Sequence, residues 1–124
     1  MFKDSLYNII ETPVSTAAEA TFVIELQPEH AVFQAHFPGE PIMPGACIVQ
    51  VIQEVTSVWR QEALQLVKVN NLKFLSVIRP DVQPRLEVQV QLTREEETQV
   101  QVKGALMAEG TDYTKFSLTF ERHG

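Results

Sequence analysis

The sequence predicts an α+β domain in which one long helix covers an antiparallel sheet. Three observations predict this class. Apolar side chains recur every three or four positions over residues 44–64, which is the helical period. Apolar and polar residues alternate over residues 85–92, as in a strand with one buried face. The segments after residue 92 are joined by turns too short for crossovers, so their strands must be antiparallel neighbours.

Length and composition exclude several classes of protein. The 124 residues suffice for one core, and we expect a single domain over residues 1–124. Hydrophobic residues make up 44% and charged residues 21%, and the net charge of -6 argues against a nucleic-acid partner. The sequence has no apolar run near the roughly 20 residues that span a bilayer and no signal-peptide core at its N-terminus. We therefore expect a cytoplasmic protein with no membrane partner.

The first third of the chain is expected to hold a helix, a strand and a short extended piece. Residues 2–11 have helix-like apolar spacing, and Pro13 is predicted to end that helix. Residues 20–26 alternate in polarity and are predicted to form a strand, followed by a turn at Pro28-Glu29. Residues 31–35 are expected to be a second extended piece that leads into a loop.

The loop and the helix after it form the most distinctive stretch of the chain. Residues 36–50 hold three of the seven prolines, two of the five glycines and the single cysteine. Prolines bias the residues before them away from helix, and glycines permit tight turns, so we expect a rigid loop. The helix is predicted to begin at Pro44 or Gly45 and to end near Leu64, because proline suits a first helical position. Its apolar face carries Ile48, Val51, Ile52, Val55 and Trp59, and its polar face carries Gln50, Gln53, Glu54, Ser57 and Gln61.

The rest of the chain is predicted to be β-structure. Residues 66–78 are expected to form a strand with a bulge or bend at Asn70-Asn71, and Pro80 and Pro84 flank a turn. Gly104 is expected to mark a further bulge. The last three strands are predicted at residues 85–92, 100–106 and 116–120, with turns at residues 93–98 and 109–112.

The string His36-Phe-Pro-Gly-Glu-Pro-Ile-Met-Pro-Gly resembles the signature of the 3-hydroxyacyl-acyl carrier protein dehydratases. The resemblance is strong from His36 to about Glu54, and residues 72–80 are similar to the family's strand after the helix. It implies the hot-dog fold, in which a curved antiparallel sheet wraps one long central helix. That family commonly forms dimers with active sites at the subunit interface. The resemblance therefore implies a homodimer or a dimer-based higher oligomer.

The same resemblance implies an activity. The family removes water from a 3-hydroxyacyl group on acyl carrier protein and leaves a trans-2-enoyl thioester, in fatty acid or related polyene lipid synthesis. The reaction needs a base at C2, a proton donor for the C3 hydroxyl and donors for the thioester carbonyl. His36 matches the family's histidine and is the candidate base, and the N–H of Gly45 matches the carbonyl-binding position. Phe37, Pro44 and Ala46 are expected beside the substrate. No cofactor and no metal are required.

The carboxylate of the family's site is displaced in this sequence. The family places a catalytic Glu or Asp, contributed from the other subunit, where this chain has Gln50, and commonly a glutamine where this chain has Glu54. A glutamine amide can hydrogen-bond a hydroxyl but cannot act as a carboxylic acid. Glu54 lies one helical turn, about 5.4 Å, further along the axis and leans back toward Gln50. We therefore expect Glu54 in the carboxylate role, beside Gln50. The alternative is that Glu54 is a solvated or salt-bridged helix residue and that Gln50 marks lost or altered activity.

Two other functions stay open at this point. A thioesterase of the same fold would use Glu54 or Gln50 to direct water at the thioester carbonyl, and fold alone does not decide between these reactions. A non-catalytic acyl-binding subunit of a hetero-oligomer would explain the missing carboxylate at position 50. The intact His-Phe-Pro-Gly sequence favours dehydration.

The remaining polar residues carry weaker signals. Cys47 is expected to be buried and inert, and His30 and His123 to lie on the surface. The three histidines and one cysteine show no metal-ligand spacing. Trp59 and Phe74 are candidates for an acyl tunnel or for the core. The basic residues available for an acidic carrier protein are Lys68, Lys73, Arg79 and Arg85.

Overall fold

The computed structural model describes residues 1–36 and 39–122, without the side chains of Ala35 and His36. Within this part of the chain, two strands are followed by two helices and then by four more strands. The elements are β1 (Tyr7–Ser15), β2 (Glu19–Leu26), α1 (Ala31–His36), α2 (Gly45–Arg60), β3 (Leu64–Phe74), β4 (Arg85–Glu95), β5 (Gln99–Ala108) and β6 (Thr111–Arg122).

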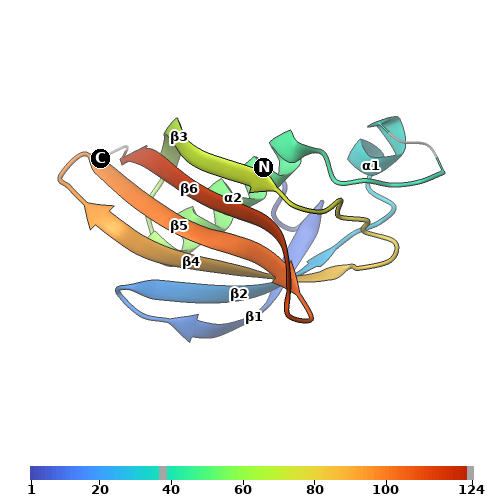
Figure 1. Cartoon of the computed structure of the whole chain (residues 1–124), viewed down its shortest axis with the longest axis horizontal. Helices are drawn as coiled ribbons and strands as arrows, with labels where there is room; N and C mark the ends of the chain where they lie inside the picture. The colour runs from blue at the N-terminus through green and yellow to red at the C-terminus, as the bar shows by residue number, and fades with distance from the viewer. Residues whose placement is uncertain (37–38, 123–124) are drawn as a thin grey trace.

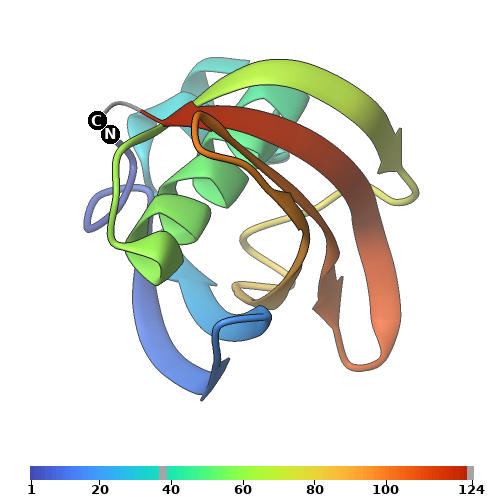
Figure 2. The same cartoon turned by 90° about the vertical axis from the view of Figure 1, so that its left-hand side faces the viewer.

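The strands form one antiparallel sheet in the order β1-β2-β4-β5-β6-β3. Figure 1 shows the strands side by side, and Figure 2 shows the sheet curving around α2. Helix α2 therefore lies on the concave face, where the apolar surfaces of helix and sheet are removed from water together. The predicted α+β architecture, a curved antiparallel sheet around one long helix, is confirmed.

Helix α2 forms where the helical period predicted it. All five residues of its predicted apolar face, Ile48, Val51, Ile52, Val55 and Trp59, are buried. The helix ends at Arg60, four residues before the predicted end. Gln61 adopts the left-handed conformation (φ 54°) and its N–H donates to the carbonyls of Ser57 and Val58, which stops the helix and lets Leu64 begin β3. In the described residues, no helix is long and apolar enough to cross a membrane.

The predicted N-terminal helix over residues 2–11 is wrong. Tyr7–Ser15 form β1, which pairs with β2 through Ile9 opposite Ile24. The apolar residues near the N-terminus fit either period, and pairing with β2 decides the outcome. Pro13 lies inside the strand because β1 is at the edge of the sheet, where a missing N–H can face solvent.

The predicted extended piece at residues 31–35 is also wrong, because Ala31–His36 form the short helix α1. Nδ1 of His30 accepts a hydrogen bond from the N–H of Val32 at 3.1 Å, which caps the first turn. The side chain of Phe33 is fully buried and holds this turn against the core. Six residues are too few for a helical period to be recognised in the sequence.

Strands β4, β5 and β6 form the predicted meander. Strand β4 runs to Glu95, so the turn expected at residues 93–98 is shorter than predicted. Gly104 is not a bulge, because it pairs with Val90 in regular register. A Cβ atom at Gly104 would lie 1.8 Å from the backbone oxygen of Gln89, so glycine permits a close approach of two strands there.

Strand β3 is the second edge of the sheet and carries the predicted irregularity at Asn70-Asn71. Its register with β6 shifts between Val69 and Asn71, which confirms a bulge. The strand and the segment after it expose an apolar surface. This surface, called the β3 apolar edge below, consists of Val67, Val69, Phe74, Leu75 and Val77.

Candidate active site

The proline-rich loop of the signature lies between α1 and α2 in the chain. The backbone of His36 ends α1, while its side chain and residues Phe37 and Pro38 lie outside the described part of the chain. The roles of His36 and Phe37 therefore stay predictions. Pro44 caps α2 in an extended conformation (φ −64°, ψ 148°), and Gly45 begins the helix. N–H groups of a first helical turn have no partner inside the helix and lie at its positive end, so the N–H of Gly45 is suited to an oxyanion.

An apolar pocket of about 350 Å³ opens beside Gly45. The ring of Phe74 packs across the start of α2, because a Cβ atom at Gly45 would lie 2.9 Å from its Cζ atom. Phe74 is therefore a half-exposed wall of this pocket, whereas Trp59 belongs to the core. The pocket is lined by Ile42, Met43, Gly45, Ile48, Phe74, Leu75, Ser76, Val77 and Ile78.

A second, smaller pocket of about 250 Å³ lies where the N-terminal segment meets α2. It is lined by Gln50 and, from the first helical turn, by Ala46 and Cys47. Met1 and Phe2 form its other wall. The predicted site residues Ala46 and Gln50 therefore line one pocket, and Gly45 lines the neighbouring one.

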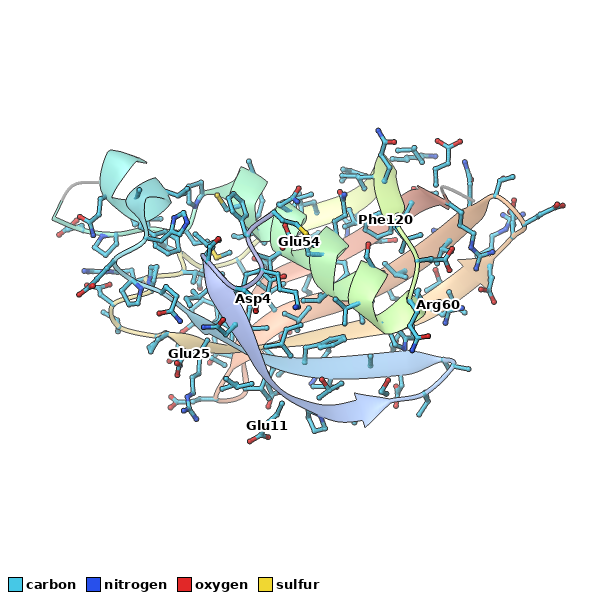
Figure 3. All side chains as sticks on the ribbon, turned by 180° about the vertical axis from the view of Figure 1, so that it is seen from behind. Asp4, Glu11, Glu25, Glu54, Arg60 and Phe120 are labelled. Carbon is cyan, nitrogen blue, oxygen red and sulfur yellow. The ribbon has the colours of Figure 1, made fainter. Side chains whose placement is uncertain are left out.

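Glu54 is buried beneath the N-terminal segment, with 3% of its surface exposed. It was expected on the polar face of the helix, and the segment before β1 covers that face at this position. Figure 3 shows Glu54 on α2, beside the segment that carries Asp4. Its Oε1 accepts hydrogen bonds from the N–H of Lys3 at 2.7 Å and the hydroxyl of Tyr7 at 3.0 Å. Its Oε2 accepts from the N–H of Phe2 at 2.9 Å and from Nε2 of Gln50 at 2.7 Å.

These contacts set the charge of the cluster. Burial alone would raise the pKa of Glu54, but the hydrogen bonds from Phe2, Gln50, Lys3 and Tyr7 outweigh it and hold the pKa below its usual range. Burial, together with the charge and hydrogen bond of Glu54, raises the pKa of Tyr7 far above its usual range. Near neutral pH, Glu54 is therefore ionised and Tyr7 is protonated. An ionised carboxylate accepts hydrogen bonds and has no proton to donate.

The structure brings Gln50 and Glu54 together, as their spacing predicted, and adds partners that sequence reasoning missed. Tyr7 stood inside the wrongly predicted N-terminal helix. The other two donors are main-chain N–H groups, which leave no trace in side-chain patterns. The three missed partners precede Glu54 by 47 to 52 residues, so no local spacing could have indicated them.

The other candidates are accounted for elsewhere in the fold. Cys47 is buried, and burial raises the pKa of its thiol, which makes it a poor nucleophile. Arg79 pairs with Asp81 at 3.0 Å and Arg85 with Glu25 at 3.1 Å, so two of the four basic candidates already have acidic partners. His123 lies outside the described residues. Among the residues that the structure does describe, no three His, Cys, Asp or Glu side chains form a group that could hold a metal ion.

Comparison with known proteins shows which family the sequence of this chain matches. The family model of the ApeI-like proteins, described as ApeI dehydratase, matches residues 12–111. The 3-hydroxyacyl-[acyl-carrier-protein] dehydratase FabZ of Caulobacter sp. (strain K31) is 32% identical over 71 residues, which is 50% of this chain and 44% of that protein. The FabZ of Thermomicrobium roseum is 32% identical over 89 residues, which is 63% of this chain and 60% of that protein. The chain thus spans about half the length of the curated relatives it matches.

Solved structures share the fold. The dehydratase heterocomplex ApeI:P from Xenorhabdus doucetiae superimposes with a TM-score of 0.67 at 16% identity, over 92% of this chain and 96% of that chain. A hypothetical thioesterase protein with coenzyme A from Streptococcus pneumoniae TIGR4 gives a TM-score of 0.68 at 10% identity, over 95% and 86%. At these identities the likeness shows the fold alone, which is the hot-dog fold expected from the sequence. The family match, in contrast, covers most of the chain, and the chain therefore belongs to the ApeI-like dehydratase family.

Proposed function

We propose that this protein removes water from a 3-hydroxyacyl group on acyl carrier protein, in cytoplasmic fatty acid or related polyene lipid synthesis. The family match and the names of the FabZ relatives support this class of reaction. The observation that carries the proposal is the apolar pocket of about 350 Å³ beside the first residue of α2. An acyl chain in this pocket would bring its thioester carbonyl to the N–H of Gly45.

The proposed steps conserve atoms and charge. His36 takes a proton from C2, and the N–H of Gly45 stabilises the negative charge that develops on the thioester oxygen. The imidazolium then gives this proton to the hydroxyl as the C3–O bond breaks. The products are the trans-2-enoyl thioester and water, and His36 is neutral again. Phe37, Pro44 and Ala46 are proposed to flank the substrate.

Gln50 and Glu54 complete the proposed site. Gln50 and Ala46 line the same pocket next to the start of α2, so a group bound there would meet both residues. We propose that this pair faces the C3 hydroxyl in place of the family's carboxylate. No cofactor or metal enters these steps.

Two copies of the chain are proposed to form the working unit. Among the described residues β3 is the last strand of the sheet, and the β3 apolar edge exposes valine side chains on it, which is a surface suited to a partner strand. A homodimer through β3 would bury this surface. Lys68 and Lys73, both exposed on β3, are the residues proposed to meet an acidic carrier protein.

The test is enoyl formation from 3-hydroxyacyl-carrier thioesters of several chain lengths, followed by mass spectrometry. We expect turnover by the wild type and loss of turnover in His36→Ala. His30→Asn is the matched control, because asparagine can still cap α1 and the change replaces another histidine. Equal turnover in His36→Ala and His30→Asn would refute the assignment of the base.

Thioester hydrolysis is the second candidate. The fold neighbour from S. pneumoniae is a thioesterase by name, and the glutamine at position 50 could orient a water molecule. Release of the free 3-hydroxy fatty acid and the carrier thiol, without any enoyl product, would favour this reaction.

A non-catalytic role in a hetero-oligomer is the third candidate. The neighbour from X. doucetiae is a heterocomplex, and the resemblance implies that Gln50 stands at the position of the family's carboxylate. A wild type that turns over no substrate alone, but gains activity with a second dehydratase subunit, would favour this role.

A further inference from the structure

The two oxygens of Glu54 have different partners, and this division points to a role for the residue. Oε1 binds groups that belong to the N-terminal segment and β1, namely the N–H of Lys3 and the hydroxyl of Tyr7. Oε2 binds the N–H of Phe2 and the carboxamide of Gln50. An ionised carboxylate has about four lone-pair sites, and these four donors occupy them.

This saturation fixes the orientation of Gln50. A glutamine carboxamide has one end that donates and one that accepts, and the two ends can exchange by rotation about the last side-chain bond. The carboxylate of Glu54 can only accept. The NH₂ end of Gln50 must therefore face Glu54, as the 2.7 Å bond shows, and its carbonyl oxygen must point away.

Gln50 lines the pocket with Ala46, one turn nearer the N-terminus of the helix. A helical side chain leans toward that end of the helix, which is where Gly45 lies. The accepting end of Gln50 is therefore available to a hydroxyl group bound in this pocket, beside Ala46.

We infer that Glu54 is a positioning residue, which holds the Gln50 carboxamide with its carbonyl oxygen toward the substrate and takes no proton itself. This inference rests on the proposed dehydration. Gln50 then accepts a hydrogen bond from the C3 hydroxyl and directs a lone pair of the hydroxyl oxygen toward the imidazolium of His36. The exchange of the two residue types keeps the hydrogen bond between positions 50 and 54 but changes what the site presents, from a carboxylate to an amide carbonyl.

A double-mutant cycle for kcat tests whether Glu54 acts through Gln50. We expect Gln50→Ala and Glu54→Gln each to lower kcat by roughly 10- to 100-fold, with a smaller change in KM, because the hydroxyl loses its alignment. In the Gln50→Ala background, Glu54→Gln should lower kcat no further. Multiplying effects would show that Glu54 acts on the substrate independently, and they would overturn the inference.

A purely structural role for Glu54 predicts a different pattern. Tyr7→Phe removes a donor to Oε1 and leaves the bond between Oε2 and Gln50 in place. We expect this variant to be less stable than the wild type but to keep kcat within about twofold. A loss of kcat in Tyr7→Phe as large as in Glu54→Gln would mean that the N-terminal segment, and not the carboxamide orientation, supports turnover.

A readout without turnover keeps the inference testable if the wild type is inactive or Glu54→Gln does not fold. The side-chain NH₂ signal of Gln50 in ¹⁵N NMR should shift as the pH falls through the lowered pKa of Glu54, and Gln53 on the same helix is the control. The groups that face Glu54 are Gln50, Tyr7 and the backbone N–H groups of Phe2 and Lys3. Asp4, whose charge also acts on Tyr7, is a second acid beside this cluster, so the titration is compared with that of an Asp4→Asn variant. If the chemical shift of the Gln50 signal changes with pH no more than that of Gln53, the inference is overturned. Absent turnover together with a titrating Gln50 signal would refute the proposed function alone.

Discussion

Replacing Tyr7 by phenylalanine removes one hydroxyl from the core and leaves the ring in place. Tyr7 is fully buried, and its hydroxyl donates to Glu54 at 3.0 Å. A hydrogen bond to a charged group contributes about 1.5–3 kcal/mol to stability. Glu54 keeps its three other donors in the variant, so we expect a loss of unfolding free energy at the lower end of this range, about 1.5 kcal/mol at pH 7.

The pH dependence of this difference is a sharper prediction. The pKa of Tyr7 is raised in the folded protein, so its contribution is present at low pH and is lost as the pH rises above the ordinary value near 10. At pH 11 the unfolded wild type gains about 1.4 kcal/mol from ionisation of this tyrosine, while the folded protein keeps it protonated. The stability gap between wild type and Tyr7→Phe should therefore nearly vanish at pH 11. Tyr113 is present in both proteins, so any contribution of its ionisation cancels from the difference.

Urea unfolding at pH 7, 9, 10 and 11 measures this gap. Equal slopes of the unfolding free energy against urea are needed for the comparison. A gap that is the same at pH 7 and pH 11 would refute a buried, protonated Tyr7 that donates to Glu54. A gap near zero at pH 7 would show that the bond does not stabilise the fold.

Three further predictions concern the fold and the site. Gly104→Ala should lower the free energy of unfolding by about 3 kcal/mol or more, because the new Cβ atom would lie 1.8 Å from a backbone oxygen. Gly110→Ala is the control: its Cβ atom would meet no neighbour, and the backbone strain at φ +79° should cost only about 1–2 kcal/mol. Glu54→Gln should make stability depend less on pH in acid. Because the pKa of Glu54 is lowered in the folded protein, its ionised carboxylate stabilises the fold at pH values above the ordinary glutamate pKa, and this contribution is lost as the pH falls. The difference in unfolding free energy between wild type and variant, measured in urea, should therefore be smaller at pH 3 than at pH 7. Gly45→Ala should lower the melting temperature in the wild type, since its Cβ meets the Phe74 ring at 2.9 Å, but not in a Phe74→Ala background; equal losses in both would contradict the packing described.

The sequence patterns predicted the elements whose signals are local. Alternation located β2 and the three strands of the meander, because each has one face in the core and one in solvent. The helical period located α2 and its buried face. Both errors near the N-terminus have one cause: residues 2–11 and 31–35 are short, and contacts with β2 and the core determine their structure.

The candidate site was predictable in part for the same reason. The signature residues and the neighbouring pair Gln50 and Glu54 follow from spacing along one loop and one helix. The burial of Glu54 does not, because it depends on a segment that is distant in sequence and binds mainly through its backbone. A polar helix face can be covered by any segment that supplies donors, and the helix sequence does not reveal it.

The use of main-chain donors has a consequence for which substitutions the N-terminal segment tolerates. Every residue type except proline carries an N–H, so the identities of Phe2 and Lys3 can vary without loss of the bonds to Glu54. In a saturation-mutagenesis scan, position 3 should accept most residues and reject proline. Position 54 should accept almost nothing, so that within one cluster of hydrogen bonds the acceptor is constrained by chemistry and its backbone donors only by geometry.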